Sequence, residues 1–414
     1  MAETAANLGL RLSSPSAADL LVINTCTVTS RTDRQIHQIL RQAARLESQP
    51  IIFVTGCYAQ RSPQKLAEFP KVQAVFGNLE KALWPDLIPV LLNNKKPFIQ
   101  VADMAGGTHF SSMPLQNFWG HTRAFVKIQD GCNHFCSYCV VPSVRGPERS
   151  LPLDAVLKQM HTLIASGFKE LVLTGINLSR YGRDLPGEES LLTLVRRLQH
   201  TSWPVRFRLS SVEPQDLSVD LLRELAQWPQ FCPHFHIPLQ SGAAPVLTAM
   251  HRNYQPDWFE ELVQQIKTLF PAAAIGLDVM VGFPTESLAD YRQTRQLLNR
   301  LPVSYLHVFP FSARPGTLAA GFQPLVGNRE IQERARDLRA LGLQKKLTFY
   351  QRQVGQVAEV LVEGNVARKS GWLTGITENY LRVHLPGPGD WANHLIRVRL
   401  TKIEGQTLIG AVVT

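Results

Sequence analysis

The sequence lacks the segments that direct a chain out of the cytoplasm or hold it in a membrane. The residues after Met1 form neither a basic n-region nor an apolar h-region, so we expect no signal peptide. No apolar run approaches the roughly 20 residues that a transmembrane helix needs. We therefore expect a cytoplasmic protein that has no membrane partner.

Cysteine and charged residues are both scarce. The chain has six cysteines among 414 residues, and without export they are expected to serve metal or redox chemistry instead of a disulfide framework. Charged residues make up only 18% and hydrophobic residues 44%, which excludes a disordered chain. Acidic residues number 33 against 43 basic ones, and the net charge of +10 favours an anionic partner, either nucleic acid or an acidic membrane surface.

Three of the six cysteines stand together in a Cys-x3-Cys-x2-Cys pattern at Cys132, Cys136 and Cys139. Thiolates at this spacing can converge on one iron–sulfur cluster, whose usual protein ligands are cysteines. Three ligands leave one iron of a four-iron cluster open, and this pattern is similar to that of radical S-adenosylmethionine (SAM) enzymes. The alternative is a zinc knuckle completed by His134, although zinc sites usually join two cysteine pairs that are far apart in the sequence.

The length predicts two or three domains, and the first, residues 1–104, is predicted to be a Rossmann- or flavodoxin-like α/β domain. Apolar runs at 19–24 and 51–55 predict parallel strands buried on both faces, with a helix at 31–45 between them. Cys26 and Cys57 each follow one of these strands, at the edge where ligands gather in open α/β folds. We expect the two thiols to meet at one ligand, the alternative being two unrelated buried cysteines.

Residues 105–120 are rich in Gly, Ser, Pro and Met and are predicted to form a linker. Residues 121–350 alternate between strand and helix patterns, which predicts a parallel sheet curved into a partial TIM-like barrel of six strand–helix units. The predicted strands are 124–128, 170–174, 205–210, 234–239, 275–281 and 305–311. Polar or glycine-containing segments follow five of them, where barrels place active sites. Turn chemistry does not explain Glu213 and Gln240 beside three thiols.

The last region, residues 351–414, is predicted to be a small OB-like β-barrel. Its predicted strands are 356–363, 373–377, 380–385, 394–400 and 407–413. Apolar residues alternate with Arg382 in one strand and with Arg397 and Arg399 in another. These cationic side chains are expected to contact an RNA backbone, the alternative being ordinary solvated strand faces.

Six longer runs, at 24–29, 55–60, 129–133, 208–214, 234–242 and 307–312, resemble the methylthiotransferase family of radical SAM enzymes over nearly the full length. Family members join an N-terminal cluster domain, a radical SAM barrel and a C-terminal TRAM domain that binds RNA. The runs are most similar to the branch that modifies threonylcarbamoyladenosine in tRNA. The resemblance therefore implies tRNA as the substrate, a small redox protein as electron donor, and a monomer.

The resemblance also implies the chemistry. A 4Fe–4S cluster on Cys132, Cys136 and Cys139 would reduce SAM and release a 5′-deoxyadenosyl radical, which would abstract hydrogen from carbon 2 of a modified adenine beside the anticodon. A second iron–sulfur cluster, on Cys26 and Cys57, would deliver a methylated sulfur to that carbon.

The resemblance further implies residues that bind SAM. Tyr138 would pack near the SAM adenine. Five residues at strand ends would hold the methionyl and ribose groups: Thr174, Gly175, Glu213, Gln240 and Asp278.

One departure concerns the second cluster, because the family uses three cysteines, the first in a Gly-Cys-x-x-Asn-Gln turn. This sequence opens at residues 2–7 with the helix that follows that turn, so only Cys26 and Cys57 are present, and Cys232 is interpreted as a packing residue. We expect a truncated domain whose native start lies about twenty or fewer residues upstream.

Several alternatives stay open. Related enzymes act on isopentenyladenosine in tRNA or on an aspartate of a ribosomal protein. A radical SAM enzyme that cleaves SAM without inserting sulfur would also have these motifs. A different class is a non-catalytic RNA-binding protein with a structural metal site.

Overall fold

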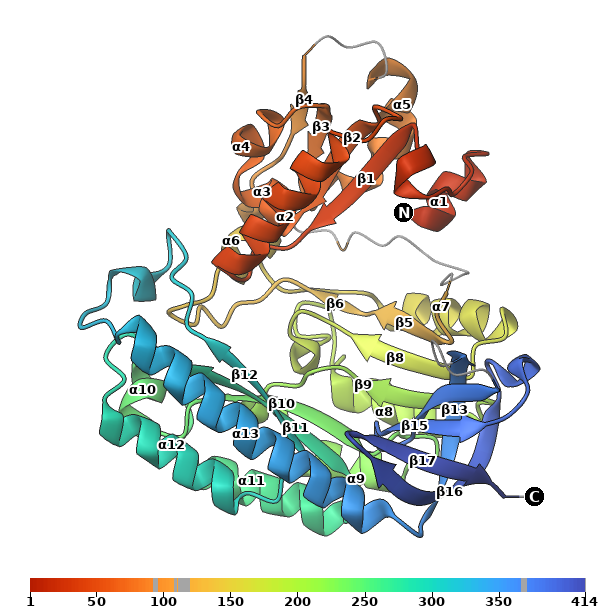
Figure 1. Cartoon of the computed structure of the whole chain (residues 1–414), viewed down its shortest axis with the longest axis vertical. Helices are drawn as coiled ribbons and strands as arrows, with labels where there is room; N and C mark the ends of the chain where they lie inside the picture. Colours follow the sequence, from red (N-terminus) through yellow and green to blue (C-terminus); the bar gives the residue numbers. More distant parts are fainter. Residues whose placement is uncertain (92–95, 108–109, 111–119, 366–370, 414) are drawn as a thin grey trace. The chain divides into compact units, whose positions relative to one another are not determined.

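The computed structural model describes residues 1–91, 96–107, 110, 120–365 and 371–413, and it contains two compact units (Figure 1). Unit 1 comprises Met1–Leu115, Asp130–Arg149 and Ser312–Gly321. Unit 2 comprises Gln116–Gln129, Ser150–Phe311 and Phe322–Thr414. The cysteine loop therefore belongs to the same unit as the amino-terminal residues. Most of the predicted linker at 105–120 lies outside the described residues.

Unit 1 is built on a parallel sheet in the order β1-β2-β3-β4. Its strands are β1 (Leu20–Thr25), β2 (Ile51–Gly56), β3 (Val72–Phe76) and β4 (Phe98–Gln100). Its helices are α1 (Ala2–Asn7), α2 (Ser30–Ala43), α3 (Cys57–Arg61), α4 (Pro63–Ala67), α5 (Trp84–Leu91) and α6 (Val141–Arg145). The predicted strand–helix–strand unit is confirmed as β1-α2-β2.

The apolar run of β2 is buried on both faces, as its uninterrupted pattern predicts. Ile52 and Val54 join one hydrophobic cluster together with Leu40 of α2, whereas Phe53 joins a second cluster with Trp84 of α5. Because successive side chains of a strand point to opposite faces, one strand supplies the centre of both layers. This packing fixes the carboxyl ends of β1 and β2, after which Cys26 and Cys57 follow.

Unit 2 contains two parallel sheets, in the orders β5-β8-β9 and β10-β11-β12. The strands are β5 (Arg123–Lys127), β8 (Glu170–Thr174), β9 (Arg206–Leu209), β10 (His234–Gln240), β11 (Ala274–Val281) and β12 (Tyr305–Pro310). The helices are α7 (Leu153–Ala165), α8 (Leu191–Gln199), α9 (Val219–Gln227), α10 (Ala244–Ala249), α11 (Pro256–Leu269), α12 (Leu288–Arg300) and α13 (Asn328–Gln353). Two short strands, β6 (Gln129–Asp130) and β7 (Arg149–Ser150), pair where the chain passes between units.

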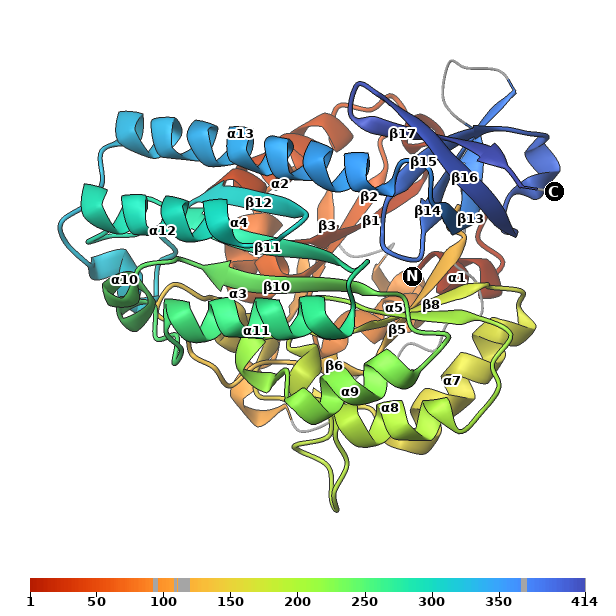
Figure 2. The same cartoon turned by 90° about the horizontal axis from the view of Figure 1, so that it is seen from below.

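Helices α11, α12 and α13 lie along the outer side of the β10-β11-β12 sheet (Figure 2). The six predicted strands of this region are all present, each within two residues of its predicted bounds. The alternation of strand and helix therefore gives the predicted partial barrel, with the amino ends of the strands at one end and the carboxyl ends at the other.

The carboxyl-terminal strands form a closed barrel in the order β13-β14-β15-β17-β16. They are β13 (Val357–Asn365), β14 (Trp372–Thr377), β15 (Arg382–Pro386), β16 (Leu395–Glu404) and β17 (Thr407–Val412). Val383 and Leu385 are buried inside this barrel, whereas Arg382, Arg397 and Arg399 are exposed. The predicted alternation is confirmed, and the small barrel is the predicted one.

A buried ionic network lies at the amino ends of the strands of unit 2. Glu170, the first residue of β8, is fully buried and accepts hydrogen bonds from Arg206 Nε and Arg208 Nε, each at 2.7 Å. The remaining guanidinium N–H groups donate to backbone oxygens of the small barrel: those of Glu359, Ile376, Thr377 and Glu378. Every charge in this layer is therefore paired and hydrogen-bonded, as burial demands.

Tyr380, in the turn between β14 and β15, closes this layer. Its ring stacks on His234, the first residue of β10, with centroids 4.2 Å apart, and the Arg208 guanidinium lies 5.0 Å from its centroid. Tyr380 has a φ of +68°, which places it in a turn, so β15 starts two residues later than predicted. The β14–β15 turn thus covers the amino ends of the strands.

Replacing Glu170 with glutamine is expected to lower the free energy of unfolding by about 3 to 5 kcal/mol, because two buried guanidinium groups lose their counter-charge. The measurement is urea unfolding followed by circular dichroism. Glu260→Gln is the control: it breaks an exposed pair with Arg300, and a change of at most about 1 kcal/mol is expected. Equal effects of the two substitutions would contradict the proposed role of burial.

The carboxyl group of Glu170 also makes the free energy of unfolding depend on pH. Burial alone would raise the pKa of Glu170, but Arg208 and Arg206 lower it from 4.5 to about 2. A group whose pKa is lowered in the folded state stabilises that state fully above its unfolded pKa. The contribution of Glu170 is therefore expected to be complete above about pH 4.5 and lost as the pH falls to about 2.

Candidate active site

The cysteine loop of unit 1 is closed by backbone hydrogen bonds. The Cys132 N–H donates to the oxygen of Gly146 at 3.1 Å, and the Cys139 N–H donates to the oxygen of Cys136 at 2.9 Å. Gly131, before the first cysteine, has a φ of +79°, and a Cβ atom there would lie 1.8 Å from a backbone oxygen. Only glycine fits this conformation and this close approach, so Gly131 sets the course of the loop.

The thiols of Cys132 and Cys139 receive backbone N–H groups, as sulfur ligands of iron commonly do. The His134 N–H points to Cys132 Sγ at 3.5 Å, and the Val141 N–H points to Cys139 Sγ at 3.4 Å. Cys136 and Cys139 also line a cavity of about 360 Å³. These donors favour the thiolate form, so the loop fits the three-cysteine ligand set of an iron–sulfur cluster.

The zinc knuckle fits this loop poorly. A single zinc ion needs ligand atoms about 3 to 4 Å apart, because its bonds are about 2.0 to 2.3 Å long. Among the described residues, no three of Cys132, Cys136, Cys139 and His134 bring their ligand atoms within 4.8 Å of one another. None of the six cysteines of the described chain forms a disulfide. A cluster of several irons, which spreads its ligands further, suits the loop better.

Cys26 and Cys57 lie where the sequence places them, each one residue beyond a strand of unit 1. The strand ends are paired in register, Thr25 with Gly56, so the two cysteines follow neighbouring residues of the sheet. Gly56 has a φ of +98°, and a Cβ atom there would lie 2.3 Å from the backbone oxygen of Thr25. Glycine is therefore required for β1 and β2 to end side by side.

Arg145 of α6 contacts Cys57, which the sequence did not predict. Its Nε–H donates to Cys57 Sγ at 3.1 Å, and its Nη1 lies 3.4 Å from a carboxylate oxygen of Asp130. Asn78 Nδ2 approaches the same sulfur at 3.8 Å. Burial alone would lower the pKa of Arg145, but Asp130 and the charges that Cys57 and Cys26 would carry as thiolates raise it overall. Arg145 therefore places a hydrogen-bond donor and a positive charge beside Cys57 Sγ.

A segment from residues 312–321 holds the loop after Cys26. Arg314 Nη2 donates to Thr27 Oγ1 at 2.6 Å and lies 2.5 Å from a carboxylate oxygen of Asp33. Arg61 Nη1 donates to the same threonine oxygen at 3.3 Å. Two guanidinium groups and the carboxylate of Asp33 thus fix the side chain of Thr27, the residue that follows Cys26.

Four of the predicted SAM-binding residues lie at or just beyond the ends of strands in unit 2. Thr174 ends β8 and Gly175 follows it, Gln240 ends β10, and Glu213 lies four residues after β9. Gln240 is 8% exposed with a φ of +65°, and in the described part of the chain its Oε1 atom has no hydrogen-bond partner. A buried acceptor of this kind suits a polar ligand group.

Glu213 does have a partner that the sequence did not indicate. Its carboxylate lies 2.6 Å from Nη2 of Arg252, a buried residue that also donates to the backbone oxygen of Pro238 at 3.0 Å. The pair fixes Glu213 after β9. Its predicted role in binding SAM stays a prediction, as does that of Tyr138, which lies half-buried in the cysteine loop.

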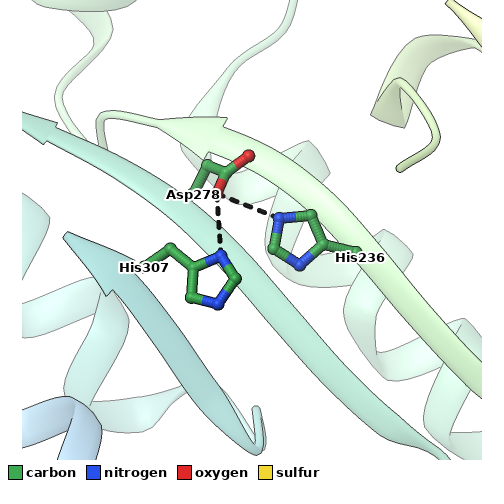
Figure 3. A group of neighbouring side chains, drawn as sticks. All are labelled: His236, Asp278 and His307. Carbon is green, nitrogen blue, oxygen red and sulfur yellow. Dashed lines mark ion pairs between the residues drawn. The ribbon is translucent and has the colours of Figure 1, made fainter. Parts of the chain in front are cut away.

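The position predicted for Asp278 is wrong. Asp278 lies in the middle of β11 and not at its end, and its side chain lies between two histidines (Figure 3). His236 Nε2 is 2.9 Å and His307 Nδ1 is 3.4 Å from its Oδ1. Burial alone would raise the pKa of Asp278, but hydrogen bonds from His236 and His307 hold it well below its ordinary value.

The remaining sequence predictions concern the small barrel and Cys232. Arg382 lies 3.6 Å from Glu363, and Arg399 donates to the backbone oxygen of Gly355 at 3.3 Å. Cys232 is fully buried, and burial raises the pKa of its thiol to about 12. The interpretation of Cys232 as a packing residue is therefore confirmed.

The part of the chain that the structure describes contains no helix long and apolar enough to cross a bilayer.

Comparison with known proteins agrees with this arrangement. The model of the Radical SAM superfamily matches residues 126–298, and that of the Uncharacterized protein family UPF0004 matches residues 1–77. The solved radical S-adenosylmethionine methyltransferase TsrM from Kitasatospora setae is 14% identical, covers 89% of this chain and 70% of its own, and superposes with a TM-score of 0.53. At that identity the likeness concerns the fold alone.

Two curated relatives are closer in sequence. The threonylcarbamoyladenosine tRNA methylthiotransferase MtaB of Aquifex aeolicus is 38% identical over 371 residues, which are 89% of this chain and 88% of that protein. The tRNA-2-methylthio-N(6)-dimethylallyladenosine synthase of Pelotomaculum thermopropionicum is 33% identical over 391 residues, 92% of this chain and 87% of that protein.

The match to the Radical SAM superfamily over residues 126–298, which include the three-cysteine loop, defines a radical SAM enzyme, with a 4Fe–4S cluster and SAM as its cofactors. Within the radical SAM enzymes, the family of this chain follows from its sequence identity of 33–38% to two curated methylthio-transferring relatives over about nine-tenths of its length. The chain belongs to the radical SAM methylthiotransferase family.

Proposed function

We propose that this enzyme transfers a methylthio group to carbon 2 of N6-threonylcarbamoyladenosine beside the anticodon of tRNA. The observation that carries the proposal is the 38% identity to the Aquifex aeolicus protein of that name, over 89% of this chain. The relative that acts on dimethylallyladenosine is less similar, at 33%. The runs at 234–242 and 307–312, which resemble the threonylcarbamoyladenosine branch, support the same substrate.

Cys132, Cys136 and Cys139 hold the first cluster in this proposal. When bound, the cluster supplies the electron that cleaves SAM reductively. The chain stabilises the thiolates of Cys132 and Cys139 through the N–H groups of His134 and Val141, which point at these two sulfur atoms. In unit 2, strand-end residues orient SAM, and among them the buried Oε1 of Gln240 accepts a hydrogen bond from the cofactor.

Cys26 and Cys57 supply ligands of the second, auxiliary cluster in the proposal. Arg145 supports it from α6, since its Nε–H donates to Cys57 Sγ and its charge offsets that of the thiolate. α6, the helix that follows the cysteine loop at 132–139, thus supplies the side chain that contacts a sulfur ligand of the auxiliary cluster.

Arg382, Arg397 and Arg399 contact the tRNA backbone in the proposal. They lie on β15 and β16, which both pair with β17, and all three are exposed. Cations on one face of a barrel attract phosphates and release counterions on binding. A small redox protein supplies the electrons for the reaction.

Nucleoside mass spectrometry of tRNA tests the assignment. A strain that lacks the gene is expected to lose the 2-methylthio form of threonylcarbamoyladenosine and to accumulate the form without sulfur, and the intact gene is expected to restore it. Unchanged methylthio-threonylcarbamoyladenosine would contradict the assignment. Loss of the methylthio form of isopentenyladenosine instead would identify the enzyme as a member of the related branch.

A further inference from the structure

Three potential metal ligands on neighbouring strands of the parallel sheet β10-β11-β12 have side chains that point toward one another. His236, Asp278 and His307 come from three adjacent strands, and Asp278 is in register with His307 (Figure 3). Their ligand atoms lie within 4.8 Å of one another, and no other such group occurs among the described residues. None of the three is needed to hold the iron–sulfur clusters of the proposed function.

The distances suit a single metal ion. Bonds of about 2.0 to 2.2 Å place neighbouring ligand atoms about 2.8 to 3.6 Å apart, depending on whether the geometry is octahedral or tetrahedral. The carboxylate oxygen of Asp278 lies 2.9 Å from His236 Nε2 and 3.4 Å from His307 Nδ1. The ligand atoms of the two imidazoles lie within 4.8 Å of each other, so binding of one ion needs at most a rotation of His307 toward His236. The side chain of His307 is 62% exposed and has room to rotate.

The surroundings of His236 resemble those of a metal-binding histidine. Such a residue usually donates its other ring N–H to an oxygen, which fixes the tautomer that leaves the coordinating nitrogen free. His236 Nδ1 lies 3.1 Å from the hydroxyl oxygen of Tyr305, and this hydroxyl lies 2.7 Å from His234 Nε2. A metal ion that bound Nε2 would replace the hydrogen bond from Nε2–H to Asp278, and Nδ1–H would then donate to the hydroxyl oxygen of Tyr305, which stabilises this tautomer.

The group is accessible from one side. Tyr305 and His307 line a cavity of about 360 Å³ whose wall also includes Arg339 and Lys346. His236, in contrast, is only 8% exposed. His307 is therefore the one ligand of the three that lines this cavity.

We propose that His236, Asp278 and His307 bind a divalent transition-metal ion, such as Zn²⁺ or Fe²⁺, through two imidazole nitrogens and one carboxylate oxygen. Two histidines and one carboxylate form the ligand set of many mononuclear zinc and iron sites, which keep open positions for water or another ligand. This site is separate from the cysteine ligands and does not depend on the identity of the modified nucleoside.

Cobalt binding tests the proposal, because Co²⁺ commonly replaces Zn²⁺ and its absorption reports the ligands. The full chain with its iron–sulfur clusters reconstituted is titrated anaerobically with Co²⁺. One equivalent is expected to bind and to give the weak visible bands of nitrogen and oxygen ligands, without the intense sulfur-to-cobalt band that thiolates produce. Asp278→Asn and His307→Ala are each expected to weaken this binding at least about 100-fold, whereas Tyr305→Phe, which alters the tautomer, weakens it about 10- to 100-fold.

His200→Ala is the matched control, since His200 is an exposed histidine outside the group, and unchanged Co²⁺ binding is expected. Equal Co²⁺ affinity in wild type, Asp278→Asn and His307→Ala would overturn the proposal. Binding only with a sulfur-to-cobalt band would overturn it as well, since the metal would then be on cysteines. If Asp278→Asn fails to fold, as judged by circular dichroism, the exposed His307 decides the question alone.

Discussion

Replacing Cys136 with alanine is expected to abolish reductive cleavage of SAM. Two thiolates, Cys132 and Cys139, cannot hold a four-iron cluster that needs three. The backbone oxygen of Cys136 accepts the Cys139 N–H at 2.9 Å, and alanine keeps this bond, so the fold of the loop is expected to survive. The measurement is 5′-deoxyadenosine formed by dithionite-reduced protein, and the expected yield is that of a control without enzyme.

Cys232→Ala is the control for this substitution. It removes a thiol that is buried in unit 2 and has its pKa raised to about 12, so iron content and SAM cleavage are expected to stay at wild-type values. SAM cleavage by Cys136→Ala at a rate within about tenfold of wild type would contradict the three-cysteine ligand set, since loss of a required cluster removes a cofactor and not a single contact.

Replacing Cys57 with alanine is expected to separate the two halves of the reaction. SAM cleavage is expected to continue, because the cysteine loop at 132–139 is untouched, whereas the methylthio product falls below detection. The physical reason is the loss of the sulfur that receives the Arg145 Nε–H at 3.1 Å and supplies a ligand to the auxiliary cluster. Both products, 5′-deoxyadenosine and the methylthio nucleoside, are measured in the same reaction with tRNA.

Arg145 offers a second way to examine the same site. Arg145→Lys retains the charge beside Cys57 but not the geometry of the Nε–H donor, and it is expected to lower methylthio transfer more than SAM cleavage. If Cys57→Ala and Cys136→Ala lose SAM cleavage equally while both remain folded, the division of labour between the two cysteine sets is wrong.

The strands and the cysteine loop could be predicted because their signals are local. An uninterrupted apolar run marks β2, and strict alternation marks β15 and β16, so neighbouring residues carry the whole pattern. The bonds from Arg145 to Cys57 and from Arg252 to Glu213 could not be predicted, since 88 and 39 residues separate the partners and no periodicity links them.

The spacing of the histidines in the sequence is a signal that could have predicted that they share one face of the sheet. His234 and His236 are two residues apart in one strand, so both face the same side of the sheet, and His307 stands two residues after Tyr305 in another. The resemblance implied a strand-end position for Asp278, whereas Asp278 lies in the middle of β11. Burial and register, which depend on all three strands together, bring the three ligand atoms within 4.8 Å of one another.

The ionic layer under Tyr380 has a consequence for how such enzymes can be assembled from parts. Arg206 and Arg208 of β9 donate to four backbone oxygens of the small barrel. If the small barrel were removed, these guanidinium groups would lose their hydrogen-bond acceptors, and the four oxygens would lose their donors. A gene fusion that exchanged the carboxyl-terminal module for an unrelated RNA-binding module would have to replace Glu170 and both arginines at the same time. The two parts are therefore expected to be inherited together.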